Sequence, residues 1–175
     1  MGQDAGMTDT RIDPPVAADE RTMLRAWLDW HRETLAVKCE GLTEEQLRLR
    51  SVPPSSMSLL GLVRHMADVE RAWFRRRLNG EDLAAIYYGD DDPDGEFDNV
   101  DSASAEEAFA TWRAEIEHAR AAEEACADLD ATAKTGREGV HYSLRWIMCH
   151  MIEEYARHNG HADLLRERVD GVTGE

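Results

Sequence analysis

The chain has 175 residues and a formal net charge of −16, with 42% hydrophobic and 32% charged residues. This balance predicts one soluble globular domain, long enough to bury its own core without disulfides or a structural metal. The acidic charge argues against binding nucleic acid or an anionic membrane, and no apolar run approaches the roughly 20 residues of a membrane span.

Three segments are predicted along the chain. Residues 1–18 are expected to be a disordered leader, residues 19–170 a single domain, and residues 171–175 a short tail. Within the leader, Met1–Asp13 is polar and acidic and lacks the basic and apolar segments of a signal peptide.

Cysteine usage indicates a reducing compartment. The cysteines are odd in number, widely spaced and in no CxxC or CxxH pattern: Cys39, Cys126 and Cys149. They predict neither a disulfide framework nor a zinc knuckle. A cytoplasmic protein is expected.

The first long helix is predicted over about residues 19–40, where apolar side chains recur at helical spacing. Thr43 with Gln46 has the form of a capping box, which predicts a short helix from Glu44 to about Leu49. An extended turn follows, because Pro53 and Pro54 exclude helical backbone just before them.

The second long helix is predicted to begin after one of three serines that can cap it, Ser55, Ser56 or Ser58, and to end at Asn79-Gly80. Residues 81–101 are then expected to form a loop. This stretch is strongly acidic, but it lacks the ligand spacing of an EF-hand, so a solvated loop is expected rather than a calcium site.

The third helix is predicted to start at a second capping box, Ser104 with Glu107, and to end between residues 125 and 129. A connection over residues 130–141 leads to the fourth helix, over about residues 143–169. Four long amphipathic helices without a convincing strand predict an all-α four-helix bundle. The connections after the first two helices are long, so the topology is left open.

Titratable side chains interrupt the apolar stripe of the fourth helix. Glu154, His158 and His161 fall within about 60° of one another, and His150 lies about 40° to the other side of Glu154. Burying such groups costs several kcal/mol each unless an ion or a hydrogen-bond network compensates. Glu154 and His158 are four residues apart, which suits joint ligation of one metal ion.

A second helix must supply the third ligand, and His65 is the donor that the sequence offers. It lies on the shoulder of the apolar stripe of the second helix. An ordinary ion pair between Glu154 and His158 remains an alternative on spacing alone. His161 could serve as a ligand, as a support behind a ligand or as a proton shuttle, and spacing does not choose.

Two stretches carry a family resemblance: SLLGLVRHMADVERAWF at residues 58–74 and HMIEEYARHNGHAD at residues 150–163. They resemble the DinB-like superfamily, which includes the DinB and YfiT proteins and the mycothiol-dependent maleylpyruvate isomerases. The similarity extends over residues 19–168 and is strongest to an actinobacterial branch.

The resemblance implies a DinB/YfiT-like four-helix bundle that holds one divalent metal ion. His65 matches the first ligand and His158 the last. The middle ligand is a histidine in many relatives, and Glu154 looks like the isomerase-type variant at that position. His161 stands where many relatives have glutamine, which favours a supporting or substrate-facing role. His150 matches an auxiliary histidine one turn before the pair.

A set of two histidines and one carboxylate leaves coordination positions open for water or substrate. The same set serves zinc hydrolases and non-haem iron oxygenases. We expect Zn²⁺, with Ni²⁺ and Fe²⁺ as alternatives. The expected site is therefore open and reactive in form.

The resemblance also implies chemistry on a low-molecular-weight thiol such as mycothiol, in S-transfer or isomerisation with an electrophilic substrate. His161 or His150 would take the thiol proton. An anionic thiol or substrate would need cationic contacts, and Arg64, Arg145 and Arg157, in or near the motifs, are the candidates. Ordinary surface charge is the alternative for each of them. A metal-dependent hydrolase and a non-enzymatic metal-binding stress-response protein are the alternatives, and a homodimer is expected.

Overall fold

The computed structural model describes residues 11–136 and 139–174. This part of the chain is helical and contains isolated β-bridges but no strand, which confirms the predicted all-α class. None of its helices is long and apolar enough to cross a membrane. The helices are α1 (Glu20–Cys39), α2 (Glu44–Arg48), α3 (Leu59–Glu70), the π-helix η1 (Arg71–Leu78), α4 (Gly95–Asp98), the 3₁₀-helix η2 (Asn99–Ser102), α5 (Ala105–Ala125) and α6 (Leu144–Asp170).

Side-chain caps start the helices where the sequence places them. The Thr43 and Gln46 capping box of α2 is present in full. Of the three candidate serines before α3, Ser58 is the one that caps the helix, because its side chain accepts from the backbone amide of Gly61. Such caps satisfy amides that a helix start leaves without partners, so the predicted starts are confirmed.

The predicted leader lies partly outside the described residues, which begin at residue 11. Residues 11–18 contain no helix before the cap of α1 at Asp19. Arg11 donates to Thr34 of α1 at 2.8 Å, and its guanidinium lies 4.7 Å from the ring centre of Trp30. At the other end, the Gly174 carbonyl accepts from Lys38.

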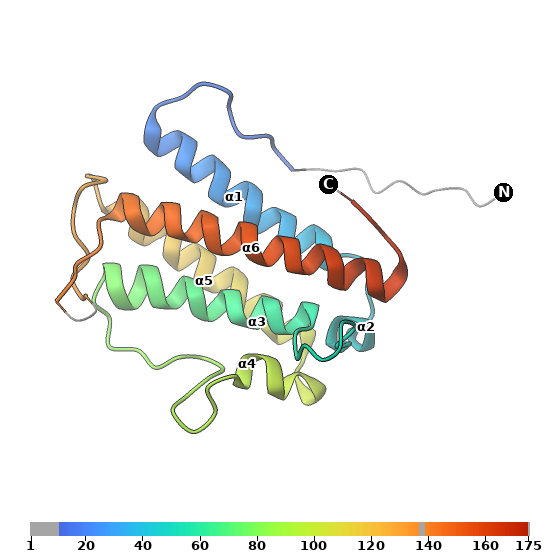
Figure 1. Cartoon of the computed structure of the whole chain (residues 1–175). Coiled ribbons are helices and arrows are strands. Elements are labelled where there is room, and N and C mark those ends of the chain that lie inside the picture. Colours follow the sequence, from blue (N-terminus) through green and yellow to red (C-terminus); the bar gives the residue numbers. More distant parts are fainter. Residues whose placement is uncertain (1–10, 137–138, 175) are drawn as a thin grey trace.

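The bundle is not a simple up-down-up-down arrangement. α1 and α6 are parallel, because their contacts advance together along both helices: Glu20 with Arg145, His31 with Asn159 and Lys38 with Asp163. α3 runs the opposite way beside α6, since His65 meets His158 whereas the later Trp73 meets the earlier His150. α5 runs in the direction of α3 (Figure 1).

The parallel pair α3 and α5 requires a long return connection. α3 and η1 together span 20 residues, about 30 Å, and residues 79–104, hereafter the crossover, lead back along this length (Figure 1). The expectation of a plain loop over residues 81–101 is wrong in part, because α4 and η2 form inside it. The position of α4 is fixed by contacts with α3, such as the hydrogen bond from Arg64 to the Gly95 carbonyl, rather than by a periodic apolar pattern.

The second long helix also differs from the single α-helix predicted. From Arg71 it continues as a π-helix to Leu78. A π-helix turns through a smaller angle per residue than an α-helix, and such segments often occur at functional sites. Phe74 and Leu78 stay buried, so the apolar stripe reaches the end of the helix through the change.

Candidate metal centre

The structure brings together the three residues predicted as metal ligands. One candidate ligand atom from each of His65, Glu154 and His158 lies within 4.8 Å of the other two. His65 comes from α3, and the other two come from adjacent turns of α6. The antiparallel packing of α3 on α6 places His65 opposite the pair, with the rings of His65 and His158 4.8 Å apart.

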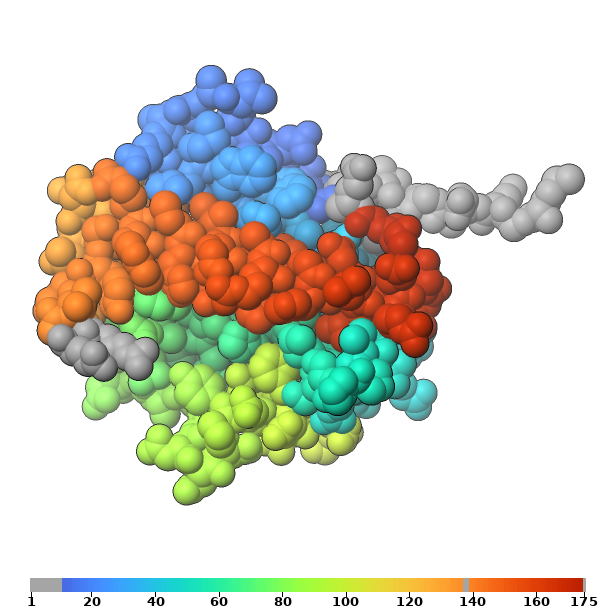
Figure 2. Space-filling view, in the orientation of Figure 1, coloured from blue at the N-terminus to red at the C-terminus, as the bar shows by residue number. Residues whose placement is uncertain are grey.

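The group is partly accessible to solvent. The side chains of His65, Glu154 and His158 are 24%, 16% and 11% exposed. In Figure 2 the green atoms of α3 lie recessed between the α6 band and the crossover. A group in this position can exchange a small ligand with solvent, as an open site requires.

Glu96, in α4, is a site residue that the sequence analysis missed. Its Oε1 atom lies 3.1 Å from His65 Nδ1, and the Phe97 ring stacks on His65 with centroids 5.4 Å apart. Glu96 is 5% exposed, and its Oε2 atom is buried without a hydrogen-bond partner. A carboxylate behind a histidine fixes which ring nitrogen carries the proton, so here Nε2 is left for a metal.

The crossover is attached to α3 by a polar strip that includes Arg64. The Asp68 carboxylate accepts from the backbone amides of Ile86 and Tyr87, at 2.6 and 3.0 Å. Arg64 donates to the Gly95 carbonyl at 3.1 Å, and its guanidinium lies 4.2 Å from the ring centre of Tyr87. Arg64 is therefore buried beneath the crossover, where it fixes the segment that carries Glu96.

Gly61 allows the same segment to approach α3 closely. A Cβ atom at this position would lie 2.7 Å from Phe97 Cδ1, well inside van der Waals contact. The glycine of the motif thus makes room for the ring that stacks on His65.

His161 lies behind His158 and outside the three-residue group. The two Nδ1 atoms are 3.3 Å apart, so a hydrogen bond between them requires a proton on one of them. A proton on His158 Nδ1 leaves His158 Nε2 free, and that atom lies 3.5 Å from Glu154 Oε2. His161 then accepts at Nδ1 and holds the His158 ring in place.

His150 lies on the other side of Glu154. Its Nε2 atom is 3.3 Å from Glu154 Oε1, and its Nδ1 atom is 3.5 Å from Glu153 Oε2. These three residues form a second group with candidate ligand atoms within 4.8 Å of one another. Glu153 is exposed and pairs with Arg157. This second group therefore reaches the protein surface, where an arginine already pairs with one of its carboxylates.

Arg157 contacts the three-residue group through Glu154. Its guanidinium pairs with Glu153 and lies 3.4 Å from Glu154 Oε2, and its side chain is 51% exposed. It therefore places a positive charge at the rim of the site. Arg145, at the start of α6, pairs instead with Glu20 and Asp130.

Burial, together with the neighbouring His65, His161 and Arg157, lowers the pKa of His158 to about 3. The unfolded chain, with an ordinary pKa near 6.5, then binds more protons than the folded metal-free protein between pH 6.5 and 3. The contribution of neutral His158 to the free energy of unfolding is complete above pH 6.5 and is lost as the pH falls toward 3.

The metal-free protein should therefore lose stability between pH 7 and pH 5, and His158→Gln should lose less over the same interval. Urea unfolding at the two pH values measures both changes. Equal losses in the two proteins would contradict the assignment of this pH dependence to His158.

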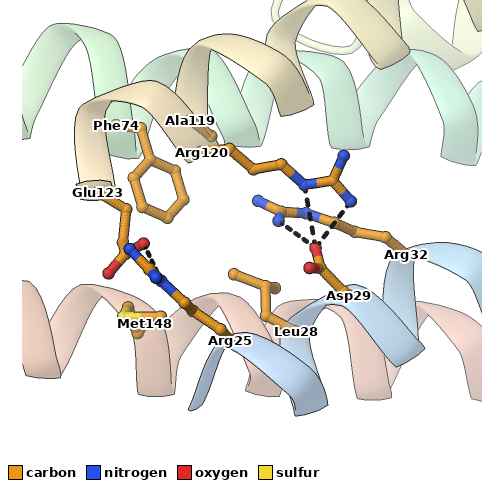
Figure 3. Close-up of a pocket in the computed structure, with 9 residues that line it drawn as sticks. All are labelled: Arg25, Leu28, Asp29, Arg32, Phe74, Ala119, Arg120, Glu123 and Met148. Carbon is orange, nitrogen blue, oxygen red and sulfur yellow. Dashed lines mark hydrogen bonds and ion pairs between the residues drawn. The ribbon is translucent and has the colours of Figure 1, made fainter. Parts of the chain in front are cut away.

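A separate cavity of about 50 Å³ lies among α1, α5, α6 and η1. Its charged side chains are already paired, as Figure 3 shows: Arg32 and Arg120 with Asp29, and Arg25 with Glu123. Because carboxylates already neutralise its three arginines, this cavity is not a good anion site. The three-residue group between α3 and α6 is therefore the better candidate for chemistry.

Comparison with known families gives a match whose range includes the whole site. The sequence model described as mycothiol-S-transferase matches residues 23–171. This range contains His65, Glu96, Glu154 and His158. No curated protein matches the chain in sequence.

Proposed function

Because the chain belongs to the mycothiol S-transferase family, within the DinB-like superfamily, we propose that it joins a low-molecular-weight thiol to an electrophilic substrate at a divalent metal ion. Mycothiol, or a thiol very like it, is the proposed thiol. The observation that carries the metal-dependent part is the convergence of His65, Glu154 and His158.

The residues fit a divalent cation by their chemistry. Two imidazoles and a carboxylate are ligands that Zn²⁺, Ni²⁺ and Fe²⁺ accept, with Zn²⁺ our first choice. The Nδ1 atoms of both histidines have partners, Glu96 and His161, which supports ligation through Nε2. A cation held here would favour thiolate over thiol and so supply a nucleophile at neutral pH.

We assign the proton acceptor to His150 rather than to His161. With Nδ1–H directed at Glu153, the lone pair of His150 Nε2, on the Glu154 side of the ring, accepts the proton as the thiol S–H bond breaks. The imidazolium is then stabilised by Glu153 and Glu154, which lie beside its two nitrogens. His161 Nδ1 is engaged with His158, so its proposed role is to position that ligand.

The group transfer needs no redox partner. The sulfur lone pair forms a C–S bond to the electrophilic carbon, and the leaving group departs with the electron pair of the bond that breaks. Arg157, at the rim, is proposed to contact an anionic part of the thiol or substrate. The contacts of Arg64 support a role in holding the crossover instead.

The test begins with the purified chain, stripped of metal and reloaded separately with Zn²⁺, Ni²⁺ or Fe²⁺. We expect one metal ion per chain and metal-dependent conjugation of mycothiol to monochlorobimane, followed by fluorescence. Absence of stoichiometric uptake would refute the metal-dependent proposal. Uptake with thiol-independent ester hydrolysis would indicate the hydrolase, and uptake with neither activity the binding protein.

Glu96 provides a more specific prediction. Glu96→Ala removes the acceptor behind His65 and should weaken Zn²⁺ binding by about 10-fold to 100-fold. Glu96→Gln keeps an acceptor oxygen and should have a smaller effect. Competition with a zinc-selective chelator measures both affinities.

Glu153→Ala is the matched control, because it removes an exposed carboxylate next to Glu154 in sequence that is outside the three-residue group. Its Zn²⁺ affinity should stay within about twofold of the unaltered protein. Equal weakening by Glu96→Ala and Glu153→Ala would show a general charge effect instead of support for His65.

A further inference from the structure

A single row of side chains joins the proposed metal centre to a cluster of aromatic rings. Residues spaced by four form a ridge along a helix, and each step advances about 6 Å. At this spacing the ridge carries Tyr142, Trp146, His150, Glu154 and His158, with Tyr142 just before the cap of α6. The aromatic rings therefore occupy the N-terminal part of the ridge, and the proposed metal ligands follow them with His150 in between.

The contacts along the ridge are continuous. Tyr142 and Trp146 have ring centroids 4.4 Å apart, and Trp146 stacks on His150 at 4.9 Å. His150 Nε2 reaches Glu154 Oε1 at 3.3 Å. A molecule lying over Trp146 would thus be two ridge steps, about 12 Å along the helix, from Glu154.

The π-helix η1 completes the cluster from the opposite side. In an unbroken α-helix, Trp73 would lie about 80° around the axis from His65. The wider turns of η1 rotate Trp73 back toward the face that carries His65. There its ring lies 4.6 Å from His150, 5.2 Å from Trp146 and 5.2 Å from Tyr142.

Trp146 remains 43% exposed in this cluster. Exposure alone does not indicate a site, since Trp27 on α1 is 42% exposed and contacts Trp30 and His31. The difference is position, because Trp146 stacks on His150, which in turn contacts the proposed metal ligand Glu154. Binding pockets combine such apolar rings with a few converging polar groups.

We propose that Trp146, with Trp73 and Tyr142, binds the planar aromatic part of the electrophilic substrate. This inference rests on the proposed transferase function. The two ends of the site differ in their side chains. The three rings lie before Glu154, with the Arg77 guanidinium 4.3 Å from the Trp73 ring centre, whereas Arg157 and His161 lie after Glu154. The polar thiol fits the second end, and a flat apolar electrophile fits the first, with its reactive carbon directed toward Glu154.

The test compares two electrophiles with the metal-loaded protein: monochlorobimane, which is planar and bicyclic, and iodoacetamide, which has no ring. Trp146→Ala should raise KM for monochlorobimane about tenfold and leave iodoacetamide and the thiol within twofold. Trp146→Phe should recover most of the loss. Trp27→Ala, a tryptophan of matched exposure, should change neither substrate.

A binding measurement separates this inference from the proposed function. Equilibrium dialysis of a halogen-free bimane, without thiol or metal, should show weaker binding to Trp146→Ala than to the unaltered protein or to Trp27→Ala. Unchanged binding would overturn the inference, as would equal losses with both electrophiles or a rise only in the thiol KM. A protein that conjugates neither electrophile refutes the transferase, while the dialysis result still decides the aromatic subsite.

Discussion

Replacing His65 with alanine should abolish stoichiometric Zn²⁺ binding and reduce thiol conjugation by at least about 100-fold. Glu154 and His158 would remain, but both come from one face of one helix and cannot enclose an ion. Loss of a residue that supports a ligand already lowers metal affinity or activity 10-fold to 100-fold, so loss of the ligand itself should lower them further. Metal analysis after gel filtration and the bimane assay measure the two effects.

His31→Ala is the control for this substitution. His31 is also a partly buried histidine, but it lies on α1, where its ring contacts Trp30 at 5.2 Å. It should keep full metal content and activity, whereas a His65→Ala protein that retains Zn²⁺ at unchanged affinity would refute the site. Circular dichroism of both variants separates a local loss from unfolding.

The long helices could be predicted from sequence because their determinants are local. Apolar spacing and capping residues such as Ser58 and Ser104 act within a few positions along the chain, and the structure confirms them. The π-helix carries no comparable signal, since Arg71–Leu78 continues the apolar stripe of α3. The direction of α5 depends on how the crossover packs, which no local pattern encodes.

The candidate site could be predicted from the sequence only in part. Helical spacing paired Glu154 with His158, whereas the choice of His65 depended mainly on family resemblance. Glu96 could not be found, because it reaches His65 only through the path of the crossover, 31 positions along the chain. The choice between His150 and His161 needed ring-nitrogen contacts, which residue spacing does not contain.

A buried network joins all four long helices, and its loss should have the largest effect on stability. Glu70 of α3 accepts two hydrogen bonds from Arg32 of α1, both at 2.8 Å, and one from Tyr155 of α6 at 2.7 Å. Trp112 of α5 donates to the Tyr155 hydroxyl at 2.8 Å. Glu70 and Tyr155 are fully buried, so these groups have no access to water as an alternative partner.

Glu70→Ala should lower the free energy of unfolding by about 3–5 kcal/mol, because it leaves the Arg32 charge buried with a single remaining partner, Asp29. Glu117→Ala, which breaks an exposed pair with Arg120, should stay within about 0.5 kcal/mol. Urea unfolding gives both values from the midpoint and slope. Similar losses in the two variants would contradict the special role of the buried charge.

The double variant Arg32→Met with Glu70→Leu tests the cause of that loss. If the penalty comes from an unpaired buried charge, removing both charges should restore part of the stability that Glu70→Ala loses, although the Tyr155 hydroxyl still lacks its acceptor. A double variant as unstable as Glu70→Ala would instead assign the loss to packing and to the Tyr155 hydrogen bond. In either case Arg32 and Glu70 lie outside the metal group, so folded variants should keep their Zn²⁺ stoichiometry.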